Sequence, residues 1–445
     1  MNVILLSGGS GKRLWPLSND VRSKQFLKLL RDENGQYQSM LQRVYGQLKQ
    51  CPTVENIVIV TSETQKSSIK SQLEAPVDII VEPTRRDTFP AIALSCAELL
   101  WNKKNLAESV VAILPVDLYA EQDFFETVQQ AVNVVEQNQG DLVLVGVKPT
   151  FPTEKYGYII PSDKLDDGVL KVSRFQEKPS AETAKVLIEQ GALWNCGVFV
   201  CRLRYITDIL ENRLGIHSYE ELLNQYGQLP KVSFDYAVVE KAEKVAVAVY
   251  DKVWKDIGTW NTLTEEMSES TMGNVTCGEG TQNTQVINEL GIPIVVLDAK
   301  NMVIAASPDG ILVTDKEKSS YLKPYVDKLS QRPMFEERVW GEYKVLDYHR
   351  HSNGMFSLVK HLFIREGQSI SYQRHLLRDE IWTVAEGTGD LLLDGNIAGV
   401  CRGDVIQIKA GQMHAVRALS PLHIIEVQIG SELSEEDIIR EPWQW

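Results

Sequence analysis

Short apolar runs alternate with amphipathic stretches along the first half of the chain. The apolar runs lie at 3–6, 57–60, 78–81, 110–114 and 142–147, and the helix-length segments between them include 39–48, 89–102 and 124–137. Buried strands that alternate with helices are typical of a mostly parallel sheet covered by helices on both faces. We therefore predict a doubly wound, Rossmann-like α/β domain, in which ligands bind at the carboxyl ends of the strands.

The pattern changes in the second half of the chain. Residues 273–315 form short β-like runs separated by Gly, Asn and Asp, without a segment of helix length. The next residues, 314–333, are polar and contain Pro324 and Pro333, which predicts a short helix and a linker. Short alternating strands separated by glycines over 338–428 predict a small all-β barrel or sandwich. The predicted domains are 1–265, 266–332 and 333–445.

Composition is that of a globular protein and narrows the choice of partners. A chain of 445 residues with 43 % hydrophobic and 24 % charged residues is long enough for more than one core. A net charge of -14 argues against nucleic-acid binding, which needs clustered Lys and Arg. Six scattered cysteines without a C-x-x-C pair indicate reduced thiols. Since we see neither a secretion signal nor a membrane-spanning apolar run, we expect a cytoplasmic protein that binds no membrane.

The first apolar run ends in a glycine loop with the sequence GGSGKRLWPLS. Gly8, Gly9 and Gly11 allow close approach of the backbone to a ligand, and their amides can point at phosphate oxygens. Lys12 and Arg13 add positive charge. By itself the loop fits either a phosphate-binding turn or a tight strand-to-helix turn without a ligand.

Two better-known nucleotide-binding motifs are excluded at this loop. A Walker A loop needs Gly at the position of Leu6 and Ser or Thr at the position of Arg13. A dinucleotide-binding fingerprint needs a third Gly at about the position of Leu14. The function of the loop therefore has to be inferred from the neighbouring sequence motifs.

Eight blocks, in order, resemble the sugar-phosphate nucleotidyltransferases. The glycine loop followed by RSKQFLKL (22–29) resembles that family's nucleotide-binding segment, and its Trp-Pro and Lys-Gln-Phe-Leu sequences resemble the mannose-1-phosphate guanylyltransferases in particular. Together the blocks cover essentially all of residues 1–265. The other seven are EPTRRDTFPAIAL (82–94), LPVD (114–117), EKYGYI (154–159), FQEKP (175–179), WNCGVFV (194–200), FDYAVVEK (234–241) and WKDIGTW (254–260).

The resemblance implies that a sugar 1-phosphate attacks the α-phosphorus of a nucleoside triphosphate and expels diphosphate, with GTP and mannose 1-phosphate as substrates and Mg²⁺ as cofactor. The nucleophile is already an anion, so catalysis depends on positioning and on positive charge rather than on a strong base.

The resemblance also implies roles for individual residues. Arg13 and Lys24 would hold the triphosphate, Lys178 the sugar phosphate, and Asp117 and Asp256 the Mg²⁺ ion. The nucleotide would further contact Leu6, Gly8, Gly9, Gly11, Lys12, Glu82 and Arg86, and the sugar would contact Gly157, Glu177 and Asn195.

Departures from the family pattern leave the specificity open. Arg85, Asp87 and Phe89 replace the more usual residues of a block expected near the nucleotide. Ser23 stands at a common Pro and Leu118 at a common His. One alternative is therefore a nucleotidyltransferase for another base or for another sugar, such as a deoxy or heptose phosphate. Another is a catalytically dead sensor of sugar nucleotides, although a metal pair would be superfluous for binding alone.

Two motifs near the C-terminus, 367–387 and 403–414, resemble those of cupin barrels. The segments 338–343 and 425–440, which includes Arg440, are similar to the type II phosphomannose isomerase domain that is commonly fused to guanylyltransferases. By this resemblance, a divalent ion such as Zn²⁺ would be held by Gln373, His375, Glu380 and His414.

Three aliphatic residues leave the activity of this cupin open. Leu376, Leu377 and Ile381 stand where the isomerases usually have histidines. A bifunctional enzyme that also isomerises mannose 6-phosphate and a purely structural or dimerising barrel are both alternatives. For residues 273–315 the resemblance implies a short β-helix-like connector, and we expect a homodimer.

Overall fold

The computed structural model describes residues 1–445 except 10, 74–75, 105 and 330–331. The described residues group into two compact units. The first contains Met1–Gly11, Ser23–Lys66 and the chain up to Ser268. The second contains Lys12–Arg22, a short stretch after Lys66, and Glu269–Trp445. No helix in the described part of the chain is long and apolar enough to cross a lipid bilayer.

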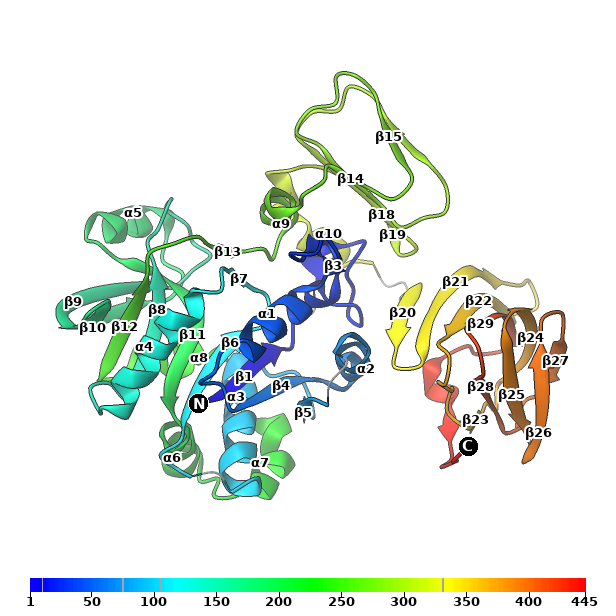
Figure 1. Cartoon of the computed structure of the whole chain (residues 1–445), viewed down its shortest axis with the longest axis horizontal. Coiled ribbons are helices and arrows are strands. Elements are labelled where there is room, and N and C mark those ends of the chain that lie inside the picture. The colour runs from blue at the N-terminus through cyan, green and yellow to red at the C-terminus, as the bar shows by residue number, and fades with distance from the viewer. Residues whose placement is uncertain (10, 74–75, 105, 330–331) are drawn as a thin grey trace. The chain divides into compact units, whose positions relative to one another are not determined.

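A nine-stranded sheet forms the centre of the first unit, with the strand order β5-β4-β1-β6-β11-β8-β12-β10-β9 (Figure 1). Strands β5, β4, β1 and β6 run parallel to one another, and β8 and β12 run parallel to each other. Strand β11 runs antiparallel to both β6 and β8, and β10 runs antiparallel to β12. The strands are β1 (Asn2–Ser7), β4 (Asn56–Ser62), β5 (Asp78–Glu82), β6 (Val110–Pro115), β8 (Leu142–Val147), β9 (Tyr158–Asp166), β10 (Val169–Gln176), β11 (Leu193–Arg202) and β12 (Val245–Tyr250).

The parallel-rich α/β fold predicted from the sequence is confirmed, since the five predicted strands are β1, β4, β5, β6 and β8. The hairpin of β9 and β10 was not predicted because its outer residues are exposed and polar, unlike those of a buried strand. The three predicted helices are α1, α3 with a π-helical extension (Glu98–Asn102), and α4. The α-helices are α1 (Met40–Lys49), α2 (Glu63–Gln72), α3 (Thr88–Ala97), α4 (Phe124–Glu136), α5 (Ala181–Glu189), α6 (Leu203–Leu214), α7 (Tyr219–Gln225), α8 (Phe234–Ala237) and α9 (Trp260–Glu266).

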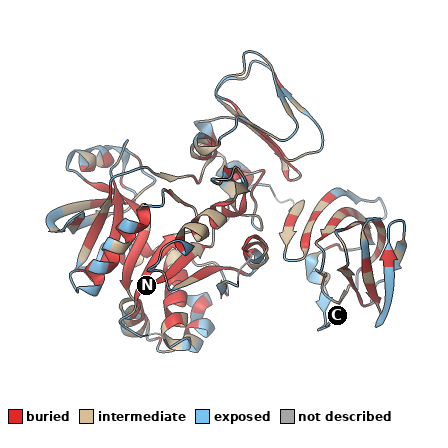
Figure 2. Cartoon of the chain, viewed as in Figure 1, coloured by how far each residue is buried: buried red, intermediate tan, exposed pale blue. Residues whose placement is uncertain are grey.

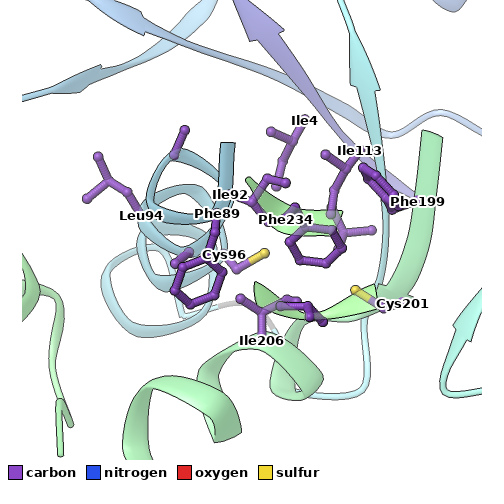
Figure 3. Close-up of a cluster of buried hydrophobic side chains, with 14 of the residues drawn as sticks. Ile4, Phe89, Ile92, Leu94, Cys96, Ile113, Phe199, Cys201, Ile206 and Phe234 are labelled. Carbon is purple, nitrogen blue, oxygen red and sulfur yellow. The ribbon is translucent and has the colours of Figure 1, made fainter. Parts of the chain in front are cut away.

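Helix α3 is buried on every side, and one hydrophobic core is built around it (Figure 2). A helix that is apolar all round can be stable only inside a core. Figure 3 shows its residues Phe89, Ile92 and Cys96 facing side chains from β1, β6, β11, α6 and α8. These side chains are Ile4, Ile113, Phe199, Cys201, Ile206 and Phe234.

Helix α4 packs against β6, β8, β11 and β12. In β6, Val111 and Ile113 belong to the core around α3, whereas Ala112 and Leu114 are also buried and must face the other side of the sheet. Helices therefore cover both faces, as the alternating pattern predicts. Two short antiparallel pairs complete the unit: β2 (Leu30–Arg31) with β3 (Tyr37–Gln38), and β7 (Leu118–Ala120) with β13 (Trp254–Asp256).

The connector in the second unit consists of short stacked strands. Parallel ladders join β14, β16 and β18, and a separate parallel ladder joins β15 and β17. Successive parallel strands of this length give the β-helix-like arrangement that was expected. The elements are β14 (Thr271–Met272), β15 (Val275–Cys277), β16 (Gln285–Asn288), β17 (Ile294–Val296), β18 (Met302–Ser307), β19 (Gly310–Asp315) and α10 (Lys323–Val326).

The C-terminal region is all-β, as predicted, with a six-stranded and a five-stranded sheet. Its own hydrophobic core includes Trp382, Leu358 and Ile424. The strands are β20 (Phe335–Arg338), β21 (Gly341–Arg350), β22 (Phe356–Ile364), β23 (Gln373–Arg374), β24 (Arg378–Glu386), β25 (Thr388–Leu393), β26 (Asn396–Cys401), β27 (Val405–Ile408), β28 (His414–Ala418), β29 (Leu422–Gly430) and β30 (Ile439–Arg440).

Candidate active site

Three charged residues converge near the carboxyl end of β6. The pairing of β13 with β7 sets Asp256 opposite Leu118, which directly follows Asp117. The Lys24 ammonium forms an ion pair with Asp117. It also lies near Asp256, because a Cβ atom placed on Gly258 would be 2.7 Å from Lys24 Nζ and 2.8 Å from Asp256 Oδ1. All three charged residues line one cavity of about 240 Å³.

The Asp117 and Asp256 side chains fit a magnesium site. Carboxylate oxygens are the protein ligands that Mg²⁺ prefers, and it usually takes only one or two of them together with substrate phosphates. The Gly258 amide donates a hydrogen bond to Asp256 Oδ1 at 2.9 Å and so orients that carboxylate. A divalent ion bound here would compete with the Lys24 ammonium for Asp117.

A polar wall of the same cavity is formed by Gly157, Glu177, Asn195 and Asp235. The Asn195 backbone amide donates to the Gly157 carbonyl at 2.9 Å, and its side-chain Nδ2 donates to Asp235 Oδ1 at 2.8 Å. Glycine is needed at 157, because a Cβ atom there would lie 2.5 Å from Glu177 Oε2. The three residues predicted to bind sugar are therefore close together.

Lys178 lies beside this wall. Its Nζ is 2.5 Å from Glu177 Oε1, so the lysine is held by the carboxylate that follows β10. The side chain is half exposed, and its φ of 44° places the backbone in the left-handed region. This conformation turns the chain sharply after Glu177.

Asp235 is a lining residue that the sequence analysis did not select. Burial, together with the negative charge of Glu177, raises the pKa of this carboxyl to about 7. Its block, FDYAVVEK, was recognised, but an Asp in the first turn of a helix is more often a favourable charge at the helix N-terminus than a ligand-binding group. Only the fold brings it to Asn195, 40 positions away in the sequence.

Two partly buried hydrogen bonds hold the glycine loop. Ser23 Oγ donates to the Gly9 carbonyl at 2.7 Å, and Gln65 Nε2 donates to the same carbonyl at 3.0 Å. Gly11 has a φ of 64°, and a Cβ atom there would lie 2.8 Å from the backbone nitrogen of Lys24. The Ser23 hydroxyl therefore supports the loop through a hydrogen bond that proline, the common residue at this position in the family, could not make. Residue 10 of the loop lies outside the described residues.

Glu82 lies under the loop at the end of β5. A Cβ atom on Gly8 would be 3.2 Å from Glu82 Oε2, and the Tyr226 hydroxyl donates to Glu82 Oε1 at 2.7 Å. Burial raises the pKa of this carboxyl. Leu6, in β1, is half-buried next to the loop.

Three other residues that were predicted to bind the nucleotide, Arg86, Lys12 and Arg13, are not among those that line the 240 Å³ cavity. Arg86 donates to the backbone carbonyls of Gly227 and Leu229. Lys12 Nζ lies 3.6 Å from Asp20 and 3.5 Å from Asp327. Arg13 is exposed in a short 3₁₀ turn. Their role in nucleotide binding stays a prediction.

A second cluster of metal-ligating side chains lies in the barrel. His375, Glu380 and His414 are buried and offer ligand atoms within 4.8 Å of one another. His375 Nε2 is 3.0 Å from Glu380 Oε1, and His414 Nε2 is 3.5 Å from Glu380 Oε2. Strand β24 places Glu380 and Trp382 on its inner face, because alternate residues of a strand point to the same side.

His414 has the orientation expected of a metal ligand. Its Nδ1 lies 3.0 Å from the Gln412 carbonyl, which places the proton on Nδ1 and leaves Nε2 as the free base. That Nε2 is buried and has no hydrogen-bond partner among the described residues. Burial lowers the pKa of the ring and keeps it neutral. The donor set therefore fits Zn²⁺ or a similar divalent ion.

Gln373, the fourth predicted ligand, is less clearly aimed at this cluster. It pairs with His414 across β23 and β28, but its Oε1 accepts a hydrogen bond from Ser371 at 2.8 Å. Arg378 Nε donates to Glu380 Oε1 at 3.2 Å. A cavity of about 500 Å³ is lined by Gln373, Glu380 and four cations: Arg338, Lys360, Arg378 and Arg440.

The aliphatic replacements noted in the cupin motif face away from this cavity. Leu376 and Leu377 are 55 % and 44 % exposed, and their backbone amides donate to Asp437. Ile381 alternates with the inward-facing Glu380 and Trp382. These three changes therefore leave the inner face of β24 and its buried carboxylate in place.

Comparison with known proteins identifies both parts of the chain. Residues 2–272 match the Nucleotidyl transferase family, and residues 328–442 match the family described as Mannose-6-phosphate isomerase C-terminal. The chain is 31 % identical to the Mannose-1-phosphate guanylyltransferase of Escherichia coli K12, over 98 % of this chain and 97 % of that protein. It is 30 % identical to the Alginate biosynthesis protein AlgA of Pseudomonas putida, over 98 % of this chain and 94 % of that protein.

A solved structure from Thermus thermophilus, described as a mannose-1-phosphate geranyltransferase, is also similar. It is 28 % identical and superimposes with a TM-score of 0.60, covering 74 % of this chain and 98 % of that chain.

Proposed function

We propose, from the premise that this chain belongs to the nucleotidyl transferase family, that it transfers the guanylyl group of GTP to mannose 1-phosphate and releases diphosphate. One observation carries the proposal. Lys24, Asp117 and Asp256 line the same cavity as Glu177 and Asn195. A cationic, metal-binding wall suits the phosphates, and a carboxylate and amide wall suits sugar hydroxyls.

The reaction follows from these two walls. An anionic oxygen of the sugar phosphate forms a bond to the α-phosphorus, the bond to the bridging oxygen of the β-phosphate breaks, and diphosphate leaves with that electron pair. Lys24 donates hydrogen bonds to the phosphates and keeps the two polyanions together. Mg²⁺ held by Asp117 and Asp256 would neutralise charge on the leaving group.

Lys178 and Glu177 would serve the sugar substrate. The ammonium of Lys178 exchanges its bond with Glu177 for one with the sugar phosphate. This exchange releases the Glu177 carboxylate to accept hydrogen bonds from sugar hydroxyls. The glycine loop, held by Ser23 and Gln65, would present its amides to the triphosphate.

A matrix of nucleoside triphosphates against hexose 1-phosphates, read by diphosphate release with Mg²⁺, tests this proposal. The expected result is turnover with GTP and mannose 1-phosphate that exceeds every other pair at least about 10-fold in kcat/KM. Preference for another base or sugar would replace the substrate assignment. Binding of both substrates without turnover would instead support a sensor.

A second candidate function belongs to the barrel, where the unpartnered Nε2 of His414 favours a bound divalent ion. We propose that this site interconverts mannose 6-phosphate and fructose 6-phosphate by moving a proton between adjacent carbons. Four cations line the 500 Å³ cavity together with four glutamates, and a phosphate group would compete with the glutamates for these cations. A coupled assay for fructose 6-phosphate, with and without added Zn²⁺, tests it. Lack of turnover in both arms would leave the barrel a structural or dimerising role.

We also propose that the protein is a homodimer and that it is cytoplasmic. The location is proposed because GTP is a cytoplasmic metabolite. Light scattering after size-exclusion chromatography and cell fractionation test these two expectations.

A further inference from the structure

We propose that Asp235 is a sugar-specificity residue whose carboxylate accepts a hydrogen bond from one ring hydroxyl of the hexose 1-phosphate, and that Asn195 positions it. The inference deepens the proposed function and rests on it. Asp235 lies in helix α8, whereas Glu177 directly follows β10 and Asn195 lies in β11, so that three separate parts of the fold contribute to this wall.

The hydrogen bonds of Asn195 distinguish its role from that of Asp235. Asn195 Nδ2 donates to Asp235 Oδ1 at 2.8 Å, while Asn195 Oδ1 accepts from the Gly197 amide at 3.1 Å. Both ends of the amide are therefore engaged by the protein, and the side chain is 8 % exposed. A side chain held at both ends is suited to fixing a neighbour, and the neighbour that it fixes faces the cavity.

The charges around Asp235 also suit a carboxylate that recognises a sugar hydroxyl by a hydrogen bond. Glu177 repels it, and Lys178 offsets that repulsion through its ion pair with Glu177. Asp235 is partly buried, and this burial raises the pKa of its carboxyl. A partly buried carboxyl that loses its hydroxyl partner is left poorly paired, and this is how polar sites reject a substrate that lacks the group.

Monodeoxy analogues of mannose 1-phosphate test the proposal. The 2-, 3-, 4- and 6-deoxy compounds are assayed with the native protein, Asp235→Ala and Asp235→Asn. For the native protein, one analogue is expected to lose about 10- to 100-fold in kcat/KM, the effect of one hydrogen bond to a charged group. In Asp235→Ala, the parent sugar falls to the level of that analogue, and the penalty for that analogue disappears.

Controls separate this role from a structural one. KM for GTP is expected to stay within about twofold, since the residue lies on the sugar side. Asp208→Asn, a half-exposed carboxylate of α6 outside the cavity, should behave as the native protein does. If Asp235→Ala does not fold, Asp235→Asn still carries the test, because its side-chain oxygen can accept the Asn195 hydrogen bond.

The possible outcomes are distinct. A uniform loss across all analogues, with their differences preserved, overturns the inference and leaves Asp235 a structural residue. Unchanged kinetics in the variants also overturn it, while turnover by the native protein keeps the proposed function. Absence of turnover by the native protein with any substrate pair removes the proposed function and, with it, this inference.

Discussion

Lysine–carboxylate pairs set the electrostatics of the cavity at the scale of single residues. Lys24 pairs with Asp117, and Lys178 pairs with Glu177. In the proposed mechanism, a phosphate competes with each carboxylate for its lysine, and the released carboxylates then serve a metal ion and the sugar hydroxyls. The same pairs would thus balance the charge of the protein and prepare both substrate positions.

Asp256→Asn is expected to lower kcat by at least about 100-fold, because the change removes one anionic oxygen from the proposed magnesium site. Steady-state kinetics with saturating GTP and Mg²⁺ measure the effect. Asp251→Asn, at an exposed carboxylate just after β12, is the matched control. Near-normal turnover of Asp256→Asn would show that this residue is not a metal ligand.

Lys178→Ala is expected to raise KM for mannose 1-phosphate by about 10- to 100-fold, the effect of losing a charged hydrogen bond. KM for GTP should change by no more than about twofold. Initial rates with each substrate varied in turn measure both constants. Equal effects on the two substrates would contradict the placement of Lys178 at the sugar phosphate.

Asp235 is expected to make the stability of the protein depend on pH. Burial and Glu177 raise its pKa from 3.8 to about 7. Between these values the folded protein keeps a proton that the unfolded chain has released, so the free energy of unfolding falls as pH rises through this window. The Tm of the native protein relative to Asp235→Asn should therefore decrease from about pH 5 to about pH 7.5. A constant difference would rule this titration out.

At the scale of elements, close contacts between short segments place the candidate catalytic side chains. Antiparallel pairing of β7 and β13 brings Asp256 beside Asp117, although 139 positions separate them (256 - 117). The turn before β9 has to pass directly over Glu177, and it does so at Gly157. Element geometry, rather than side-chain choice alone, thus determines the shape of the cavity.

Gly157→Ala is expected to lower kcat/KM for mannose 1-phosphate by at least about 10-fold, because the added methyl group displaces Glu177 Oε2 and the Phe175 ring. Gly46→Ala in α1 is the matched control, since its Cβ atom meets no atom within 4 Å. That control should keep full activity. Unchanged kinetics of Gly157→Ala would mean that the contact relaxes without moving Glu177.

At the scale of the whole molecule, the first unit and the barrel each have a separate hydrophobic core and a separate cluster of chemically active residues. Because each core is built from its own part of the chain, a change at one cluster should leave the other intact. The two proposed activities can therefore be tested independently in the full-length protein.

His414→Asn is expected to lower zinc retained after dialysis to less than about one tenth of the native amount, because it removes the unpartnered imidazole nitrogen. Guanylyl transfer should stay within about twofold of the native rate. Elemental analysis and the diphosphate-release assay measure the two quantities in one preparation. Equal zinc content in both proteins would argue against a metal at this cluster.

Local pattern in the sequence determined much of this protein. Apolar runs identified β1, β4, β5, β6 and β8, because consecutive apolar side chains fill the middle of each strand, as expected where helices cover both faces of a sheet. Ordered motifs predicted the family, and most of the residues they selected for the metal and the sugar lie around one cavity. These signals are short-range, so they can be read from neighbouring residues alone.

Only the tertiary structure decided the contacts between distant residues. Asp235 meets Asn195 across 40 positions, and Gln65 reaches the Gly9 carbonyl across 56. The exposed setting of Leu376 and Leu377 likewise depends on how the strands of the barrel close. Strand register and packing bring these groups together. Such contacts leave no periodic signal in the sequence, because the residue types around one partner do not depend on the residue types around the other.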